Sequence, residues 1–521
     1  MSKKHKLLIL IVLIAAVLRL WNLGNIPSHL RNDEAALGYN AYSVLNSGKD
    51  EHGGFFPILF RSFGDWKPGL YVYLTIPFVA ILGLNEWSVR LPGAISGILS
   101  VYLLYLLVKS LFNSQRVAQA SAFSLAISPW HITFSRGAWE AQVTVALIIA
   151  GILFFIKALN KNKWYLFLSA GFFGASLLMS HSAKPATPII FICLLLTYWR
   201  KISKIPFKII LLGSLLFILL SLPIIFSFFN DKNTRVTSLL FTNKYQVLSM
   251  ETLTSDFLKN WTSHYNLPVL FIKGDGNPQH SAADFGAFTP FEIVFLFLGL
   301  KSFIKMKDID LETKLFILTL LILTPLASAL TSEGVNFVRY LTFFMVINII
   351  LGLGLSNFKR NLFWGIFILF YILSFLLFLD AYFIHNLPKN SAWQNGYKEM
   401  VEFITSRQTS FPKVYVPQSG DQPYIFFLFY QKYSPEKFQA ISDSVNIVNG
   451  SNSGMDYVSK LGNIEFVDFQ NFTIPLNQSS LVVLPGNNSY KFEDSLKNIH
   501  EIKDPIGFPI YKIGEYIPKK L

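Results

Sequence analysis

The chain has 521 residues, of which 52% are hydrophobic and only 15% are charged. A soluble protein of this size would have about a quarter of its residues charged, so we expect an integral membrane protein. The formal net charge is +14, yet residues 389–521 contain 13 basic and 13 acidic residues, so the excess lies in the apolar part. Basic cytoplasmic loops explain that excess better than nucleic acid binding does.

Eleven apolar stretches predict membrane-spanning helices, because each approaches the length of about 20 residues that crosses a bilayer. In chain order they are 7–23, 91–108, 117–133, 139–156, 165–181, 186–199, 207–228, 289–304, 315–331, 337–356 and 361–383. A twelfth stretch, 69–84, is short and contains Pro77. We predict that it forms a juxtamembrane helix on the outer face.

Short basic loops between these stretches set the predicted topology. Since Lys and Arg favour cytoplasmic loops, the basic loops and the N-terminus are expected inside. Two long loops, 24–89 and 229–288, and the tail from 385 are then outside, in a multi-pass protein of the cell membrane. The basic loops carry Lys109/Arg116, Lys157/Lys161/Lys163, Arg200/Lys201/Lys204/Lys208, Lys301/Lys305/Lys307/Lys314 and Lys359/Arg360.

The tail predicts a second domain. Residues 1–384 form the membrane domain in this division, and 385–521 form a small extracytoplasmic α/β domain. Its expected helices are 396–407 and 492–502, and its expected strands are 413–417 and 480–485. The stretch "PYIFFLFYQKY" fits a strand or a helix equally well. Cys193 is the only cysteine, which excludes an intramolecular disulfide and a cysteine-based metal site.

The first long loop contains an adjacent acidic pair, Asp33 and Glu34, directly before an amphipathic stretch that ends near Gly48. One interpretation is structural, with Asn32 or Asp33 capping the helix and the acids favoured in its first turn. The other is chemical, with a carboxylate at the membrane surface serving as a general base. Both can hold together, because a cap fixes the position of the side chain.

Lys67 stands before a proline at the start of the predicted juxtamembrane helix. It fits a lysine that extends along the helix to reach the interface. It also fits a contact to a lipid phosphate, since it lies at headgroup depth.

Several further charged residues fall at the outer ends of predicted spans: Arg136 with Glu140, His181 with Lys184, and Arg339. Arg136 and Glu140 are spaced for an ion pair one helical turn apart. Arg339 lies slightly inside its span, where a charge is costly unless it faces a cavity or a partner.

The second long loop contains His280 with Asp275 and Asp284 near its return to the membrane. These side chains leave a divalent metal open as a cofactor, although a glycine-rich loop that shapes a pocket explains them too. No other cofactor is indicated, and the usual nucleotide-binding and hydrolase motifs are absent from the sequence.

Together, these features resemble a known family. The acidic "DE" pair, the "KP" before the juxtamembrane helix, the run "EWSVRLPGAISG" and the later loop "GDGNPQH" are similar to those of the GT-C integral-membrane glycosyltransferases. The similarity is to the bacterial branch related to protein O-mannosyltransferases and the lipid A aminoarabinose transferase, over residues 5–385. The aminoarabinose branch has two prolines after the lysine, whereas this chain has "KPGL", which argues against a lipid A acceptor.

The resemblance implies roles for individual residues. Asp33 matches the catalytic acidic position and Glu34 its neighbour, which shapes the site. Lys67 matches a contact to the lipid phosphate, and Arg339 lies where the family often places basic residues near that phosphate. His280 lies in a loop that varies among members. We predict Asp33 and Glu34 as catalytic, and as substrate-binding residues Lys67, Arg136, Lys184, His280 and Arg339.

The implied reaction is an inverting transfer of a sugar from a polyprenyl-phosphate carrier to a hydroxyl of a protein, lipid or glycan on the outer face. Two other classes remain open. One is a transporter or flippase of lipid-linked sugars, and the other is a polymerase of such saccharides. Transporters usually place polar groups in broken helices at the midplane, whereas the ionisable residues here lie mainly in outer loops and at span ends.

Overall fold

A computed structural model describes residues 3–230, 250–282, 285–357, 362–385, 393–419, 421–442, 447–449, 456–469, 472–475, 477–486, 490 and 493–518. The chain divides into two compact units. The first unit comprises residues 1–21, 67–71 and 91–384, and the second comprises residues 22–66, 72–90 and 385–521. The second unit therefore joins most of the first predicted outer loop to the tail.

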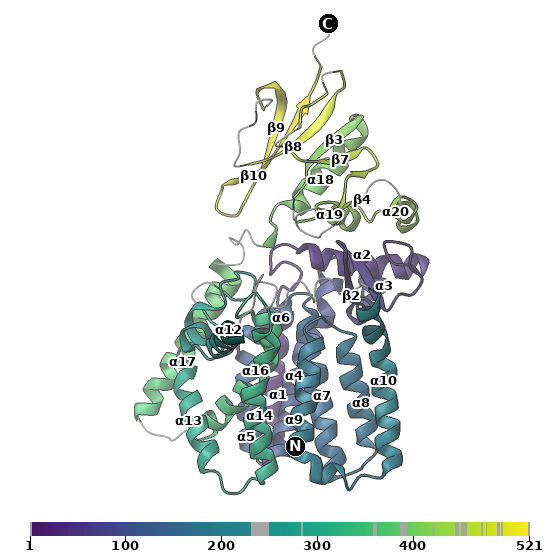
Figure 1. Ribbon diagram of the computed structural model, residues 1–521. Coiled ribbons are helices and arrows are strands. Elements are labelled where there is room, and N and C mark those ends of the chain that lie inside the picture. Colours follow the sequence, from purple (N-terminus) through teal and green to yellow (C-terminus); the bar gives the residue numbers. More distant parts are fainter. Residues whose placement is uncertain are drawn as a thin grey trace. The chain divides into compact units, whose positions relative to one another are not determined.

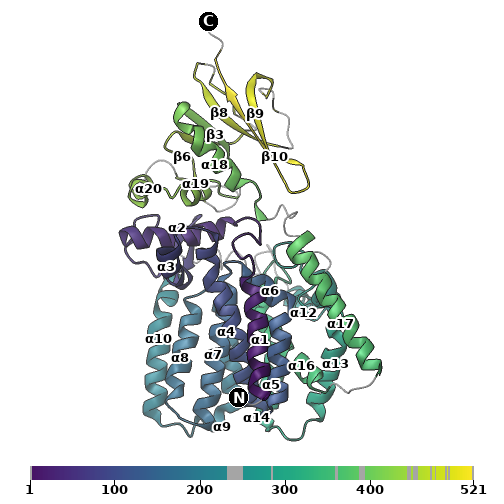
Figure 2. The same cartoon turned by 180° about the vertical axis from the view of Figure 1, so that it is seen from behind.

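The first unit is helical, and the predicted spans fall on helices, although 117–133 and 315–331 are each divided between two helices (Figures 1 and 2). Six helices among the described residues are long and apolar enough to cross a bilayer. The predicted fold class is confirmed, while the total of eleven spans stays a prediction. The helices are α1 (Lys3–Leu20), α4 (Glu86–Phe112), α5 (Gln115–Ile127), α6 (Pro129–Arg136), α7 (Glu140–Asn160), α8 (Tyr165–Leu177), α9 (Ala183–Ile202), α10 (Phe207–Phe229), α12 (Met250–Ser263), α13 (Glu292–Lys305), α14 (Leu311–Leu323), α15 (Leu326–Ala329), α16 (Phe337–Ser356) and α17 (Leu362–Asp380), with π-helical turns at Val269–Lys273 and Ala381–His385.

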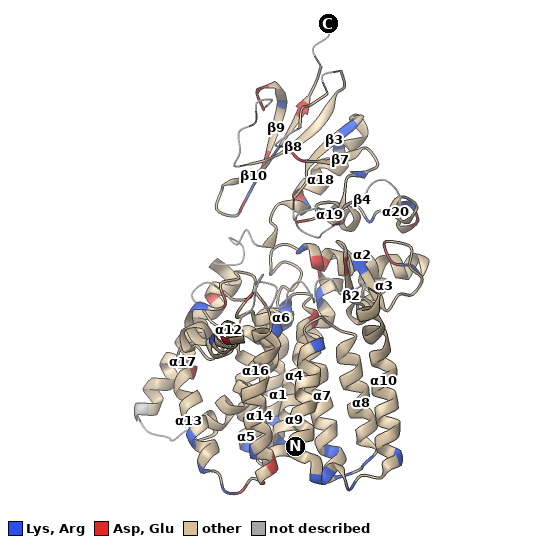
Figure 3. Cartoon of the chain, in the orientation of Figure 1, with Lys and Arg blue, Asp and Glu red and all other residues tan. Residues whose placement is uncertain are grey.

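Basic residues of this unit gather at the end of the helices that carries the N-terminus (Figure 3). Lys201, in the last turn of α9, pairs there with Asp310, just before α14, at 2.9 Å. This common end agrees with the predicted set of basic loops, although the side of the membrane stays a prediction. Lys359 and Arg360 lie outside the described residues.

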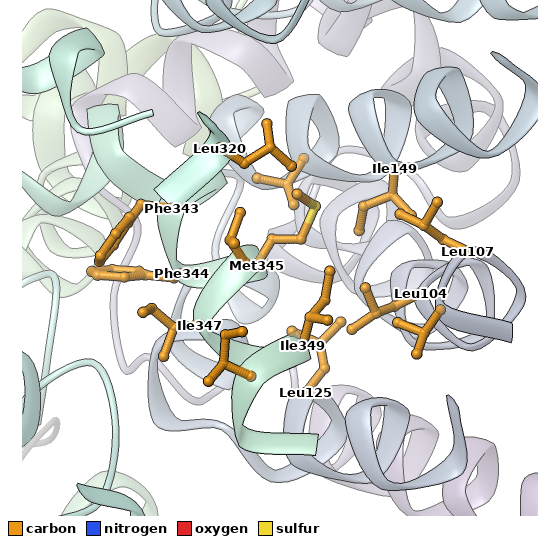
Figure 4. Packing of buried hydrophobic residues seen from close by; sticks show 14 of the residues in the cluster. Leu104, Leu107, Leu125, Ile149, Leu320, Phe343, Phe344, Met345, Ile347 and Ile349 are labelled. Carbon is orange, nitrogen blue, oxygen red and sulfur yellow. The ribbon is translucent and has the colours of Figure 1, made fainter. Parts of the chain in front are cut away.

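Helix α16 is the most buried of the candidate spans and packs against α5, α7, α13 and α14. Figure 4 shows its aromatic and aliphatic side chains meeting those of α4, α5, α7 and α14. Its approach to α13 depends on glycine. A Cβ at Gly299 would collide with the carbonyl oxygen of Ile350, and one at Gly354 with that of Phe295. Small residues commonly permit such contacts between membrane helices, where packing rather than water exclusion drives association.

A buried polar chain links α1 to α6 and α7. Arg19 donates to the carbonyl oxygen of Ala126 at 2.9 Å, and its Nη2 lies 2.5 Å from Nδ1 of His131. Because a guanidinium group only donates, Nδ1 accepts and the proton of a neutral His131 is on Nε2. That nitrogen lies 2.8 Å from the side-chain amide of Gln142, which can accept the proton only through its oxygen. Arg19, His131 and Gln142 thus contact one another inside the apolar bundle.

The second unit combines loop elements with a mixed six-stranded sheet of order β6-β7-β3-β8-β10-β9. Helix α18 packs on the sheet through the stacked rings of Phe403 and His500 (Figure 1). Its elements are α2 (Asn32–Ser47), β1 (Leu59–Ser62), β2 (Asp65–Pro68), α3 (Leu70–Leu82), α18 (Tyr397–Arg407), a 3-10 turn at Gln408–Ser410, β3 (Lys413–Pro417), α19 (Tyr424–Tyr430), α20 (Pro435–Ser442), β4 (Ile447–Asn449), β5 (Asp456–Val458), β6 (Lys460–Leu461), β7 (Ile464–Val467), β8 (Ser480–Pro485), a 3-10 turn at Glu493–Ser495, β9 (Leu496–Lys503) and β10 (Pro509–Tyr516).

The predicted helix over 492–502 is wrong, because most of this stretch is strand β9. It pairs antiparallel with β10, with Ile502 opposite Tyr511. The turn between them is held by Asp504, whose side chain accepts the amides of Ile506 and Phe508. Pairing with a later segment outweighs local helical preference. The helix at 396–407 and the strands at 413–417 and 480–485 form as predicted, and the ambiguous stretch forms α19.

The close contact between α13 and α16 yields a stability prediction. Gly299→Val should destabilise the first unit by about 1–3 kcal/mol, because the added side chain pushes the two backbones apart. Thermal unfolding of the purified protein in detergent measures the change. Gly365→Val in α17 is the control, since a Cβ there meets no atom within 4 Å. Equal unfolding temperatures for the two variants would contradict the proposed tight packing.

Candidate functional site

The acidic pair of the first loop lies in the first turn of α2. The helix ends at Gly48, whose φ of 69° is left-handed, as the sequence predicted. The predicted cap by Asn32 or Asp33 is wrong: the N-cap residue is Arg31. A guanidinium group has no acceptor, so Arg31 cannot cap with its side chain. Instead, the carboxylate of Glu34 accepts the backbone N–H of Arg31 at 3.1 Å.

Glu34 forms a buried ion pair with Arg90, near the start of α4. Both side chains are fully buried, and Nε of Arg90 lies 3.1 Å from Oε1 of Glu34. Arg90 also donates to the carbonyl oxygens of Leu23, Pro27 and His29. Its donors are thus directed to acceptors in one loop, which is the condition under which burying two charges is tolerated. Glu34 shapes the loop, and its geometry does not support direct proton transfer.

Asp33 differs from its neighbour. Its side chain is only half-buried, and its backbone N–H is bound by the side-chain oxygen of Asn32 at 2.8 Å. Neighbouring residues on a helix do not face the same way, so the burial of Glu34 turns Asp33 to another side. Of the pair, Asp33 is therefore the more exposed carboxylate.

Lys67 lies on β2, just before the proline that precedes α3. Its side chain is half-buried. The backbone N–H of Leu70 donates to the carbonyl oxygen of Leu178 at 3.0 Å, so the end of α8 fixes the chain beyond Lys67. Helix α3 has 13 residues, or about 20 Å at 1.5 Å per residue. That length is too short to cross a bilayer, as expected for a juxtamembrane helix.

Arg136 is fully buried at the end of α6. Its guanidinium group donates to the carbonyl oxygens of Leu18 and Trp21 and lies 4.7 Å from the ring centroid of Phe383. These contacts close the end of α1, and they favour a structural role over the predicted contact to substrate.

Arg339 and Lys184 lie at the starts of α16 and α9. Arg339 pairs with Glu333 at 2.8 Å, and 17% of its side chain is exposed. The ammonium group of Lys184 lies 5.6 Å from the ring centroid of Phe228. Arg339 lines a small cavity whose wall also includes Ser182 and Thr342.

His280 is buried against Asp275, with Nδ1 and Oδ2 2.6 Å apart. The same carboxylate oxygen accepts the N–H of Phe337 at the start of α16, at 2.7 Å. The imidazole lies between the rings of Phe134 and Trp139. His280 and Asp275 thus anchor α16. Among the described residues no three His, Cys, Asp or Glu side chains group as a metal site, and Asp284 lies outside these residues.

Comparisons with known proteins agree with this architecture. The structure of ArnT from Cupriavidus metallidurans bound to undecaprenyl phosphate matches with a TM-score of 0.63 and 11% identity over all of both chains. The oligosaccharyltransferase of Archaeoglobus fulgidus tethered with an acceptor peptide matches with a TM-score of 0.52 and 14% identity, over 82% of this chain and 63% of that chain. Residues 67–226 match the family model described as dolichyl-phosphate-mannose-protein mannosyltransferase.

The chain has the same fold as these two solved structures. Two Bacillus subtilis (strain 168) proteins named as candidate mannosyltransferases are also similar to parts of this chain. YkcB is 31% identical over 36% of this chain and 26% of its own length, and YycA is 30% identical over 31% and 23%. The similarity thus spans about a quarter of these relatives. The family resemblance drawn from the sequence is confirmed.

Sequence reasoning missed two buried arginines that hold their surroundings in place. Arg90 stood in the quoted "EWSVRLP" run without a partner, and only the fold brings it to Glu34. Arg19 interrupts the first apolar stretch, and a charge at that depth was the available signal for a buried polar contact.

The burial of the Glu34–Arg90 pair yields a prediction. Arg90→Met should destabilise the second unit by about 3–5 kcal/mol, because it leaves a buried carboxylate without its partner. Thermal unfolding measures the loss. Arg61→Met is the matched control, since Arg61 pairs with Asp456 while 33% of its side chain is exposed. Its loss should be about 1 kcal/mol or less, and a loss as large as that of Arg90→Met would contradict the interpretation.

Proposed function

We propose that this protein is an inverting glycosyltransferase that moves a sugar from a polyprenyl-phosphate carrier to an acceptor hydroxyl at the outer face of the membrane. The observation that supports it most is the division within the acidic pair. Glu34 is held by Arg90, and Asp33 remains half-exposed beside it. Similar solved structures hold undecaprenyl phosphate in ArnT and dolichol-phosphate in the archaeal oligosaccharyltransferase, which agrees with a lipid-linked donor.

In the proposed step, the acceptor oxygen attacks the anomeric carbon, and the bond from that carbon to the phosphate oxygen breaks. The lipid phosphate leaves with the electron pair, and the hydroxyl proton passes to Asp33. A single displacement inverts the anomeric centre. A carboxylate near the reaction centre both accepts the proton and stabilises the positive charge that develops on the sugar ring.

Positive charge must meet the departing phosphate, and Lys67, Lys184 and Arg339 are the proposed contacts. All three side chains are half-buried, so they combine a restricted position with access to a ligand. In this proposal, Arg339 contributes through the cavity that it lines, because the hydroxyls of Ser182 and Thr342 add donors to its guanidinium group. Arg136 and His280 support the site from within the bundle.

The role of Asp33 yields a direct prediction. Asp33→Asn should lower kcat by about 100-fold or more, because the amide cannot accept the proton. Binding of the donor should change little. The measurement is transfer of radiolabelled sugar from polyprenyl phosphate by purified protein in detergent. Asp494→Asn is the control for loss of a carboxylate, since that aspartate is exposed in the tail. Full activity in Asp33→Asn would overturn the assignment.

The role of Lys67 yields a prediction on donor affinity. Lys67→Met should raise the KM for the polyprenyl-phosphate sugar by about tenfold or more, because a hydrogen bond to a charged group contributes roughly 1.5–3 kcal/mol. Steady-state kinetics at varied donor concentration measure the change. Lys437→Met is the control, since that lysine is exposed on α20. An unchanged KM in Lys67→Met would remove Lys67 from the donor site.

A further inference from the structure

The first turn of α2 is stabilised from outside its own segment. The backbone N–H of Asn32, the residue before Asp33, donates to the side-chain oxygen of Gln394 at 2.6 Å. The first N–H groups of a helix have no partner within it, and a side chain at the N-cap usually supplies one. Arg31 cannot do so, and Gln394 supplies an acceptor for one of these groups from a position 362 residues later in the chain.

The orientation of Gln394 is itself determined. Its side-chain nitrogen donates to Oδ1 of Asp421 at 2.8 Å, and the hydroxyl of Tyr397 donates to Oδ2 of the same carboxylate. A carboxylate only accepts, so the amide nitrogen must face Asp421 and the amide oxygen must face Asn32. The backbone of Gln394 has a φ of 50°, which is uncommon outside glycine and persists only where the surroundings require it.

A second connection reaches the same turn through α4. Lys398 and Tyr430 both contact Oε1 of Glu86, at 3.0 and 3.3 Å. Glu86 precedes Arg90 by one helical turn, and Arg90 holds Glu34. Residues of the tail thus contact the turn that carries Asp33 both directly, at Asn32, and through the start of α4.

The opposite end of α2 provides an internal comparison. Gln439 on α20 donates to the hydroxyls of Ser43 and Ser47 and to the carbonyl oxygen of Asp50, at 3.0–3.1 Å. Both glutamines connect the tail to α2. Gln394 holds the first turn of α2, whereas Gln439 holds its C-terminal half, because Ser43 lies almost three turns beyond Asp33.

We propose that Gln394 is a positioning residue for Asp33, so that the C-terminal part of the chain sets the geometry of the catalytic carboxylate. This inference rests on the proposed function, in which Asp33 is the base. Gln394 acts through the backbone of Asn32 and has no direct role in the reaction. Loss of its acceptor leaves the N–H of Asn32 without this partner, so the first turn of α2 opens more readily and the position of Asp33 is less restricted, although Glu34 still holds the turn to Arg90.

The experiment compares Gln394→Met with Gln439→Met, since methionine keeps the approximate volume of glutamine and removes its hydrogen bonds. The first measurement is hydrogen exchange of the peptide 30–37, which does not depend on activity. Exchange should be faster in Gln394→Met and unchanged in Gln439→Met. Wild-type exchange in Gln394→Met would overturn the proposal.

The second measurement separates kcat from KM. Gln394→Met should lower kcat by about 10- to 100-fold, the range expected for misplacement of a catalytic group, with KM for the donor within about twofold of wild type. Gln439→Met should keep the wild-type kcat, even if its unfolding temperature falls as much as that of Gln394→Met. Equal kcat losses in both variants would reduce Gln394 to a structural role and overturn the proposal. An inactive wild-type protein would overturn the proposed function, whereas the exchange rates would still report whether Gln394 holds α2.

Discussion

The buried ion pair between Glu34 and Arg90 is the interaction on which the candidate site depends. Two charges without solvent are stable only when their hydrogen-bonding groups are satisfied, and Arg90 meets this condition by also binding the carbonyl oxygens of Leu23, Pro27 and His29. The pair therefore sets the path of the loop as well as the orientation of α2. A lysine could not replace Arg90, because its compact ammonium group lacks the planar fork that reaches several acceptors.

The ion pair with Arg90 explains why the adjacent residues Asp33 and Glu34 have different surroundings. Consecutive residues on a helix project about 100° apart, so one side chain can be buried while the next remains accessible. The carboxylate that Arg90 binds becomes part of the scaffold. The carboxylate of Asp33 stays half-exposed at the N-terminal end of the same helix. In the proposed function, the acidic pair thus combines one structural and one chemical role within a single turn.

The sequence predicted what depends on local composition and could not predict what depends on distant contacts. Apolar stretches located the helices, and Gly48 marked the end of α2 because a left-handed terminus favours glycine. Residues 492–502 have the composition of a helix, and only pairing with 509–516 makes most of them a strand. The sequence predicted a cap by Asn32 or Asp33, whereas only the fold shows that the helix starts after Arg31 and that Gln394 supplies an acceptor there. The predicted boundary between the membrane domain and the tail lies at residue 384. In the structure, most of the first outer loop belongs to the same unit as the tail.

The predicted cations show the same limit, since they were chosen for their position at the ends of spans or in the outer loops. Arg136 donates to backbone oxygens at the end of α1, and His280 is held by a carboxylate that also anchors α16. Neither property is encoded near the residue itself. Arg339 has an ion-pair partner as well, yet part of its side chain stays exposed beside a cavity. A cation can bind a ligand only if its neighbours leave some of its hydrogen-bond donors accessible. Donors that are bound to carbonyl oxygens are not accessible, and only the folded structure shows which donors these are.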